Sequence, residues 1–102
     1  MPRNKLVVVI DGRENTRETN RPYTHVLVGP KIYWGDDLYR TQDRAQYAGY
    51  RVVYSWHLTF AAADRARREH MSPDNGWGRL YSRLASKFGV PFTVEEVALQ
   101  HA

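Results

Sequence analysis

The hydrophobic pattern of the chain changes its period most clearly between Tyr50 and Met71. Apolar and polar residues alternate over residues 50–58, which predicts a β-strand with one packed face. Thr59 can cap a helix, and residues 60–71 are rich in helix-forming residues and contain neither Gly nor Pro. We therefore expect a strand that leads directly into a helix.

The N-terminal part of the chain predicts a β-hairpin. Residues 5–10 form a β-branched apolar run, and Asp11 and Gly12 are a pair preferred in two-residue hairpin turns. Residues 13–19 are polar on both faces, so we interpret them as an exposed edge strand whose charges oppose edge-to-edge aggregation. A mobile loop over the same residues is the alternative.

A further strand is predicted over residues 23–28, where the alternating pattern resumes. Gly29 and Pro30 are expected to end this strand. Residues 31–34 then extend or restart it. Over residues 36–47 the signals conflict, and we predict a short helix there.

The second long helix has the most regular apolar pattern in the chain. Over residues 77–88, apolar side chains recur at spacings of three and four. Gly89 is placed to end this helix in the left-handed conformation. Thr93 and Glu96 then have the spacing of a capping box, which predicts a short terminal helix through residues 97–99.

This order of strands followed by helices is typical of an α+β fold. We predict a single domain over residues 1–102, with an antiparallel sheet of three to four strands and two to three helices packed on one face. The covered sheet face and the second helix would supply the core. Its expected members are Tyr50, Val52, Tyr54, Trp56, Trp77, Leu80, Leu84 and Phe88. The other sheet face would remain open and would carry Arg51 and His57.

Composition is that of a soluble globular protein. Hydrophobic residues make up 42% and charged residues 25% of the chain, which argues against global disorder. The longest apolar run, residues 6–10, is too short to span a bilayer, and no signal-peptide core is present. The absence of cysteine excludes disulfides and thiolate zinc sites. We expect a cytoplasmic protein.

The charge balance is mildly basic, with 15 Lys and Arg against 11 Asp and Glu. Both halves of the chain are about equally basic, so no tail or arm concentrates the charge. The basic residues of the helices are Arg65, Arg67, Arg68, Arg79, Arg83 and Lys87. A solvated surface is the simpler interpretation of these faces, and nucleic-acid binding through them is the alternative function.

Histidines offer a candidate for catalysis. Tyr23 and His25 lie on one face of strand 23–28, and His57 lies on the open face of strand 50–58. If both of these faces are on the same side of the sheet, the two histidines and the tyrosine converge there. Neutral imidazoles are common proton shuttles and metal ligands. No carboxylate stands at a ligand-like spacing from either histidine, so we predict no enzymatic activity, metal site or cofactor. A small hydrolase or nuclease centred on these histidines is the weakest alternative.

Aromatic residues interleaved with Arg give a stronger functional signal. The chain has seven Tyr and three Trp, residue types that are enriched at protein interfaces and that also stack on single-stranded bases. The predicted partner-binding residues are Tyr23, His25, Tyr33, Trp34, Tyr39, Arg51 and His57. Our first hypothesis is a non-enzymatic module that binds a protein partner through the open sheet face and the aromatic segment.

Two short motifs resemble small uncharacterised proteins of actinobacterial phages. One is Arg-Pro-Tyr-Thr-His-Val-Leu-Val at residues 21–28, and the other is Tyr-Ser-Trp-His at residues 54–57, which leads into an Ala- and Arg-rich helix. The resemblance carries no established activity and no functional residue. It implies a phage protein that acts in the cytoplasm of a bacterial host, where its partner would be a host protein.

Overall fold

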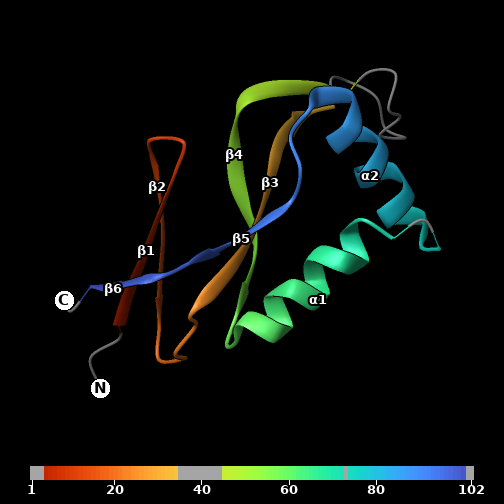
Figure 1. The fold of residues 1–102 in the computed structure, drawn as a ribbon. Helices are drawn as coiled ribbons and strands as arrows, with labels where there is room; N and C mark the ends of the chain where they lie inside the picture. The colour runs from red at the N-terminus through yellow and green to blue at the C-terminus, as the bar shows by residue number, and fades with distance from the viewer. Residues whose placement is uncertain (1–3, 35–44, 73, 101–102) are drawn as a thin grey trace.

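The computed structural model describes residues 4–34, 45–72 and 74–100, and it shows an α+β fold (Figure 1). The elements follow one another as β1 (Asn4–Ile10), β2 (Arg13–Thr19), β3 (His25–Tyr33), β4 (Gln46–His57), α1 (Phe60–His70), α2 (Gly76–Phe88), β5 (Thr93–Glu96) and β6 (Ala98–Gln100). The α+β class predicted from the sequence is confirmed. The described residues form six strands, however, where three to four were expected.

The strands form two antiparallel sheets where one was expected, with the orders β2-β1-β6 and β4-β3-β5. β5 and β6 are successive segments of the chain separated by Val97, whose backbone N–H donates to the carbonyl of Thr24 at 2.9 Å. The chain therefore passes directly from one sheet to the other (Figure 1).

The N-terminal hairpin follows its local sequence. Asp11 and Gly12 adopt φ angles of 51° and 79°, as both central residues of a type I′ turn require. Residues 13–19 form β2, so the strand rather than the loop interpretation is confirmed, and most of its residues are exposed. The Asp11 carboxylate accepts from the Arg51 backbone N–H at 2.8 Å and from its guanidinium at 3.0 Å. This contact joins the hairpin turn to β4.

The strand predicted over residues 50–58 is present as the longer β4, but its faces differ from the prediction. Leu27 and Val28 of β3 pair with Ser55 and Val53, so Tyr54 is an extra residue on β4. Such a bulge shifts the alternation by one position. Tyr54 faces the helices as expected, whereas Trp56, beyond the bulge, packs on the opposite side of the sheet.

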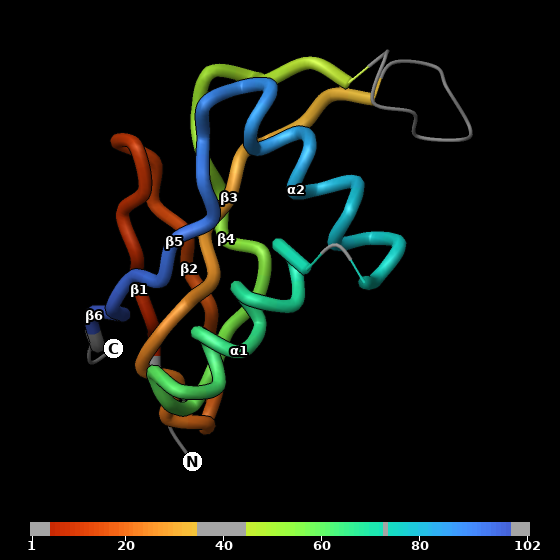
Figure 2. The backbone as a smooth tube through the Cα atoms, turned by 45° about the vertical axis from the view of Figure 1, so that its right-hand side comes forward, coloured from red at the N-terminus to blue at the C-terminus, as the bar shows by residue number. Residues whose placement is uncertain are grey.

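Both faces of the β4-β3-β5 sheet are covered, so the expected open sheet face is wrong. On one side, Val26 and Val28 of β3 are buried with Val8 and Ile10 of β1. On the other side, Leu27 is buried with Ala85 of α2. Figure 2 shows the β3–β4 pair between the β1–β2 hairpin and the helices. The physical reason is that the apolar face of β1 needs a partner surface.

Both predicted helices are present, and both lie on one side of the β4-β3-β5 sheet (Figure 2). The Thr59 hydroxyl caps α1 by accepting from the Ala62 backbone N–H at 3.1 Å. The Asn75 side chain caps α2 in the same way by accepting from the Gly78 backbone N–H at 3.0 Å. Gly89 ends α2 with a φ of 68° in the left-handed region, as its position predicts.

Two local predictions are wrong, and a third lies mostly outside the described residues. The terminal helix at residues 97–99 is wrong, because residues 93–96 pair with β3 and residues 98–100 pair with β1. The helix over 36–47 falls mostly on residues 35–44, which lie outside the described residues, and its end belongs to β4. Gly29 and Pro30 do not end the strand, since β3 continues to Tyr33.

The predicted core is right only in part. Leu84 is fully buried, but Trp77 remains 58% exposed at the start of α2. Side chains of β1 and β3 form much of the core in place of the aromatic residues. Its fully buried large members include Leu6, Val26, Leu27, Val28 and Leu84.

Candidate binding site

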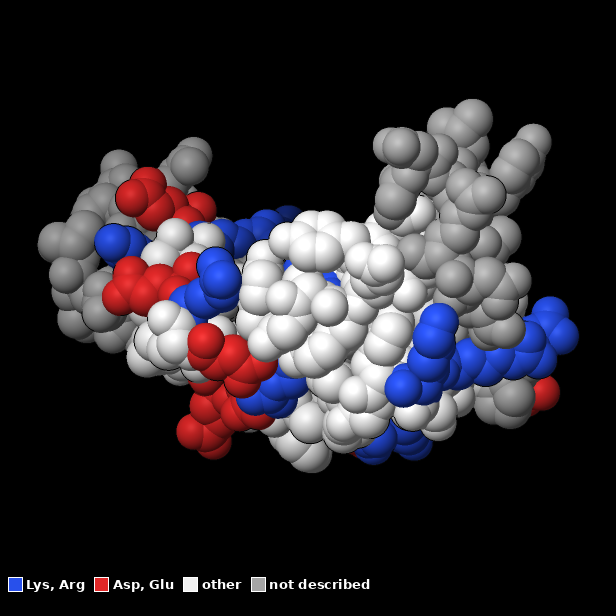
Figure 3. Space-filling view, turned by 90° about the horizontal axis from the view of Figure 1, so that it is seen from above, with Lys and Arg blue, Asp and Glu red and all other residues white. Residues whose placement is uncertain are grey.

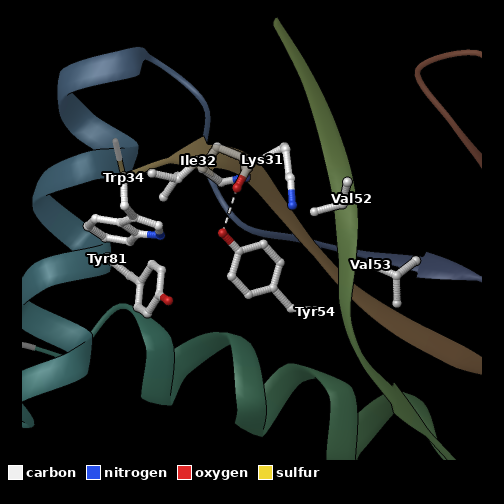
Figure 4. A pocket seen from close by; sticks show the side chains of 8 residues that line it. Lys31, Ile32, Trp34, Val52, Val53, Tyr54 and Tyr81 are labelled. Atoms are coloured by element: carbon white, nitrogen blue, oxygen red, sulfur yellow. Dashed lines mark hydrogen bonds between the residues drawn. The ribbon is translucent and has the colours of Figure 1, made fainter. Parts of the chain in front are cut away.

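A cleft of about 230 Å³ opens between the end of β3, β4 and α2 (Figure 4). Its lining is aromatic and aliphatic apart from one lysine. The residues are Pro30, Lys31, Ile32, Trp34, Val52, Val53, Tyr54 and Tyr81. A cleft with apolar walls and few polar groups is the usual form of a site for a small apolar group.

Tyr54, the bulge residue of β4, lines this cleft. Its hydroxyl donates to the Pro30 carbonyl at 2.5 Å, as the dashed line in Figure 4 shows. Burial raises the pKa of Tyr54 well above its ordinary value, and Tyr81 adds to the rise. The hydroxyl therefore stays protonated and keeps Tyr54 oriented as one wall of the cleft.

Tyr81 forms the wall contributed by α2. Its ring lies edge-on to Tyr54 and to Trp34, with centroid separations of 5.7 and 6.4 Å. On the outer side it stacks on Trp77 with an interplanar angle of 27°. Aromatic pairs in such arrangements gain stability beyond their buried area. The rings therefore form a continuous, mutually supported surface from the cleft to the exposed Trp77.

Lys31 gives the cleft its one cationic side chain. It is half-buried on β3, and in Figure 4 its side chain extends beside Tyr54 and toward Val52. An ammonium group next to apolar walls can pair with an anionic group on a ligand. The cleft can thus accept an apolar side chain and hold a carboxylate at its edge.

A second hollow, of about 380 Å³, lies on α2 and is lined by Gly76, Arg79, Leu80 and Arg83. Within the described residues, Arg79 and Arg83 form no ion pair. At the end of the molecule away from the hairpin, Figure 3 shows mostly Lys and Arg with an acidic side chain beside them, whereas at the hairpin end both signs are mixed. Because α2 lines both the hollow and the cleft, Arg79 and Arg83 lie on the helix that forms one wall of the cleft.

The other basic helix face is partly neutralised. Arg67 and Arg68 of α1 both pair with Asp64, at 2.8 and 3.3 Å. Arg65 is exposed and forms no ion pair with any residue that the structure describes. The six basic residues predicted as a phosphate-binding surface are thus not equivalent, because two of them already form ion pairs with Asp64.

The predicted partner-binding residues do not form one surface. Trp34 lines the cleft, and Tyr33 is 53% exposed at the end of β3. A hydrogen bond with Tyr50 raises the pKa of Tyr33. Tyr23 lies on the other side of the sheet against Trp56, at a centroid distance of 6.4 Å. Tyr39 lies outside the described residues.

Arg51 is held by Asp11 and lies near the join between the two sheets. The Arg51 guanidinium lowers the pKa of the Asp11 carboxyl, mainly through their side-chain hydrogen bond. Because both charges are already paired in this contact, Arg51 is poorly placed to bind an anionic partner.

His25 and His57 are opposite each other in the β3–β4 pair, so the structure does bring the two histidines together. They lie on the helix side of the sheet, where the His25 ring contacts Phe60 edge-on. His57 Nε2 is 2.7 Å from the Ser55 hydroxyl, and burial lowers the pKa of His57 together with the nearby charge of His70. Tyr23 does not join them.

Two of the cleft residues, Val52 and Tyr54, were assigned to the core from the sequence alone, and Tyr81 was not among the predicted partner-binding residues. A signal for Tyr81 was present, because Trp77 and Tyr81 stand four residues apart on one face of a helix. Tyr54 was expected on the helix-covered face of its strand, and it does lie there, but nothing in the sequence indicates that a cleft forms beside it.

Neither helix is long and apolar enough to cross a membrane among the residues described. Over the same residues, His, Asp and Glu side chains form no group of three that could hold a metal ion. Comparison of the chain with protein-family models, with curated proteins and with solved structures finds no match. The function therefore has to be argued from the cleft and its surroundings.

Proposed function

We propose that this protein is a non-enzymatic binding module that receives an apolar side chain of a protein partner in the cleft between β3, β4 and α2. The observation that carries the proposal is a cleft of about 230 Å³ whose walls include Trp34, Tyr54 and Tyr81. Buried pockets for one apolar side chain, walled by aromatic residues, are the usual centres of binding energy at protein interfaces.

One exposed aromatic residue extends this surface beyond the cleft. Trp77 is 58% exposed and stacks on the cleft wall at Tyr81. Large rigid rings bury much area at low entropic cost when a partner docks. The cleft with its aromatic rim replaces the open sheet face as the proposed docking surface. The resemblance to phage proteins supports a bacterial host protein in the cytoplasm as the partner.

The proposal is tested by titrating small probes into the ¹⁵N-labelled protein and following its indole N–H signals by NMR. The three Trp residues report on different places: Trp34 lines the cleft, Trp77 lies at its rim, and Trp56 packs between the sheets. N-acetyl-phenylalanine methylamide and N-acetyl-leucine methylamide should shift the Trp34 signal saturably in the millimolar range. The Trp56 signal should not move, and the glycine analogue should have no effect.

A matched pair of variants localises the effect. Val52→Phe places a ring in the cleft and should abolish the saturable shift at Trp34, because Val52 lines the cleft. Val9→Phe adds the same ring at a position that is already 62% exposed on β1, and should leave the shift unchanged. Absence of a saturable Trp34 shift with every apolar probe overturns the proposal. A response to thymidine monophosphate alone would instead favour nucleic-acid binding.

A further inference from the structure

The helix α2 contains basic residues and no acidic ones. Its helical residues include Arg79, Arg83 and Lys87, and none of its 13 residues is acidic. Arg79 and Arg83 are four residues apart, so they lie on the same face, about 6 Å from each other along the axis. Both are exposed, and neither is paired with a described carboxylate. This face therefore lacks the counter-charges that Asp64 supplies to α1.

This cationic face and the aromatic cleft share a wall. Leu80 lines the hollow between the two arginines, and its chain neighbour Tyr81 lines the cleft. Both residues pack against the same buried cluster as Trp34. A ligand that fills the cleft therefore has Lys31 on the cleft side and Arg79 with Arg83 on the outer side of this wall.

We infer that the segment bound in the cleft is acidic, with an apolar anchor residue flanked by Asp or Glu side chains that pair with Arg79, Arg83 and Lys31. This inference rests on the proposed function and adds the chemistry of the partner. Guanidinium groups bind carboxylates in a bidentate geometry, and complementary charge at the rim of an interface sets specificity and association rate.

A protein segment fits these charges better than a nucleic-acid strand does. A strand needs a continuous positive track along its phosphates. The cations of the described surface are instead interrupted: Asp64 pairs with both Arg67 and Arg68, and the hairpin end mixes both signs (Figure 3). A short cationic patch beside an apolar cleft matches a peptide with one anchor and a few carboxylates.

The test compares three peptides of the same length, Ac-EEFEE-NH₂, Ac-QQFQQ-NH₂ and Ac-KKFKK-NH₂, by the shift of the Trp34 indole signal and by titration calorimetry. We expect the Glu peptide to bind at least about threefold more tightly than the Gln peptide, because exposed ion pairs contribute modestly. The Lys peptide should bind most weakly. Raising the salt concentration should reduce the advantage of the Glu peptide.

Variants assign the effect to α2. Arg79→Gln with Arg83→Gln should bring the Glu peptide to the affinity of the Gln peptide, whereas Arg65→Gln on α1 removes an equally exposed cation and should change nothing. Equal affinity of all three peptides, with Trp34 still shifting, overturns the acidic partner but leaves the cleft proposal standing. Failure of every peptide to shift Trp34 overturns both. The oligonucleotide dT10 provides the remaining comparison. If it binds more tightly than the Glu peptide, and if this binding is lost in the Arg79→Gln, Arg83→Gln variant, the patch is a nucleic-acid site instead.

Discussion

At the scale of single residues, the contact between Gly29 and Phe92 explains why β3 carries a glycine at a position where the strand continues. A Cβ atom on Gly29 would lie 2.2 Å from Cε1 of the Phe92 ring. Phe92 is 4% exposed and belongs to the same buried cluster as Leu27. Gly29 is thus required for close approach of a ring, and its φ is not in the left-handed region.

Gly29→Ala should therefore destabilise the protein by about 1–3 kcal/mol, the usual cost of overpacking a core. The measurement is the midpoint of urea unfolding followed by circular dichroism. Gly76→Ala is the matched control, since a Cβ at Gly76 meets nothing within 4 Å and Ala is the better helix former. Equal midpoints for the two variants would show that the Phe92 ring moves aside at no cost.

At the scale of elements, the packing of α1 on the sheet covers a histidine whose protonation opposes folding. His57 has its pKa lowered from 6.5 by burial and by the charge of His70, which comes from α1. The Ser55 hydroxyl lies 2.7 Å from His57 Nε2, and His25 faces it across the strand pair. The folded state thus favours the neutral imidazole of His57.

Stability should consequently fall as the pH drops below 6.5. In that range the unfolded chain binds a proton at His57 before the folded protein does, so acid favours unfolding; above it, both states carry the neutral imidazole and the contribution is complete. Urea midpoints at a series of pH values check this. His57→Gln should flatten the slope between neutral and mildly acidic pH, whereas Ser55→Ala keeps the imidazole and should retain it. An unchanged slope in His57→Gln would assign the effect to another group.

The elements also show which parts of the structure can be predicted from the sequence. The caps at Thr59 and Gly89 and the turn at Asp11 were correctly placed, because each depends on residues within a few positions along the chain. The segment 93–99 was assigned to a helix, because a capping-box spacing is local, whereas its pairing with β3 and β1 is not. A helix of so few residues is unstable unless tertiary packing supports it, so pairing of this segment with β3 and β1 is the more stable arrangement.

The same distinction explains the candidate site. Trp34 was identified as a surface aromatic from its segment, and it does line the cleft. The arrangement of β4 against the helices could not be predicted in full, because the bulge at Tyr54 shifts the alternation beyond it, which turns Trp56 away from the helices and His57 toward them. A shift of one residue in a strand moves each later side chain to the other face. Arg51 and His57 were consequently placed on a shared open face that does not exist.

At the scale of the whole molecule, the chain runs from β5 in one sheet directly into β6 in the other, and this segment joins the two layers of the protein. Val97 stands between β5 and β6, packs against the cluster that holds β1 against β3, and donates its backbone N–H to Thr24 at 2.9 Å. Since β6 pairs with β1 and β5 pairs with β3, this junction couples strand pairing in one sheet to strand pairing in the other. We expect the two sheets to unfold as one cooperative unit while the junction is intact.

Val97→Pro and Val97→Ala separate the packing of this residue from its hydrogen bond. Val97→Ala shortens the side chain but keeps the N–H. Val97→Pro removes the donor and leaves the Thr24 carbonyl without it, which should cost about 1 kcal/mol more than the alanine variant. Proline also holds Glu96 in the extended region that it already occupies in β5, so strain before the junction is small.

In hydrogen-exchange experiments, the most protected amides of β1 and β3 should share one opening free energy in the unmodified protein and in Val97→Ala. In Val97→Pro the β1 amides should exchange faster than those of β3. Equal protection of both strands in all three proteins would mean that the buried side chains of β1 and β3, and not the crossing strand, make the molecule cooperative.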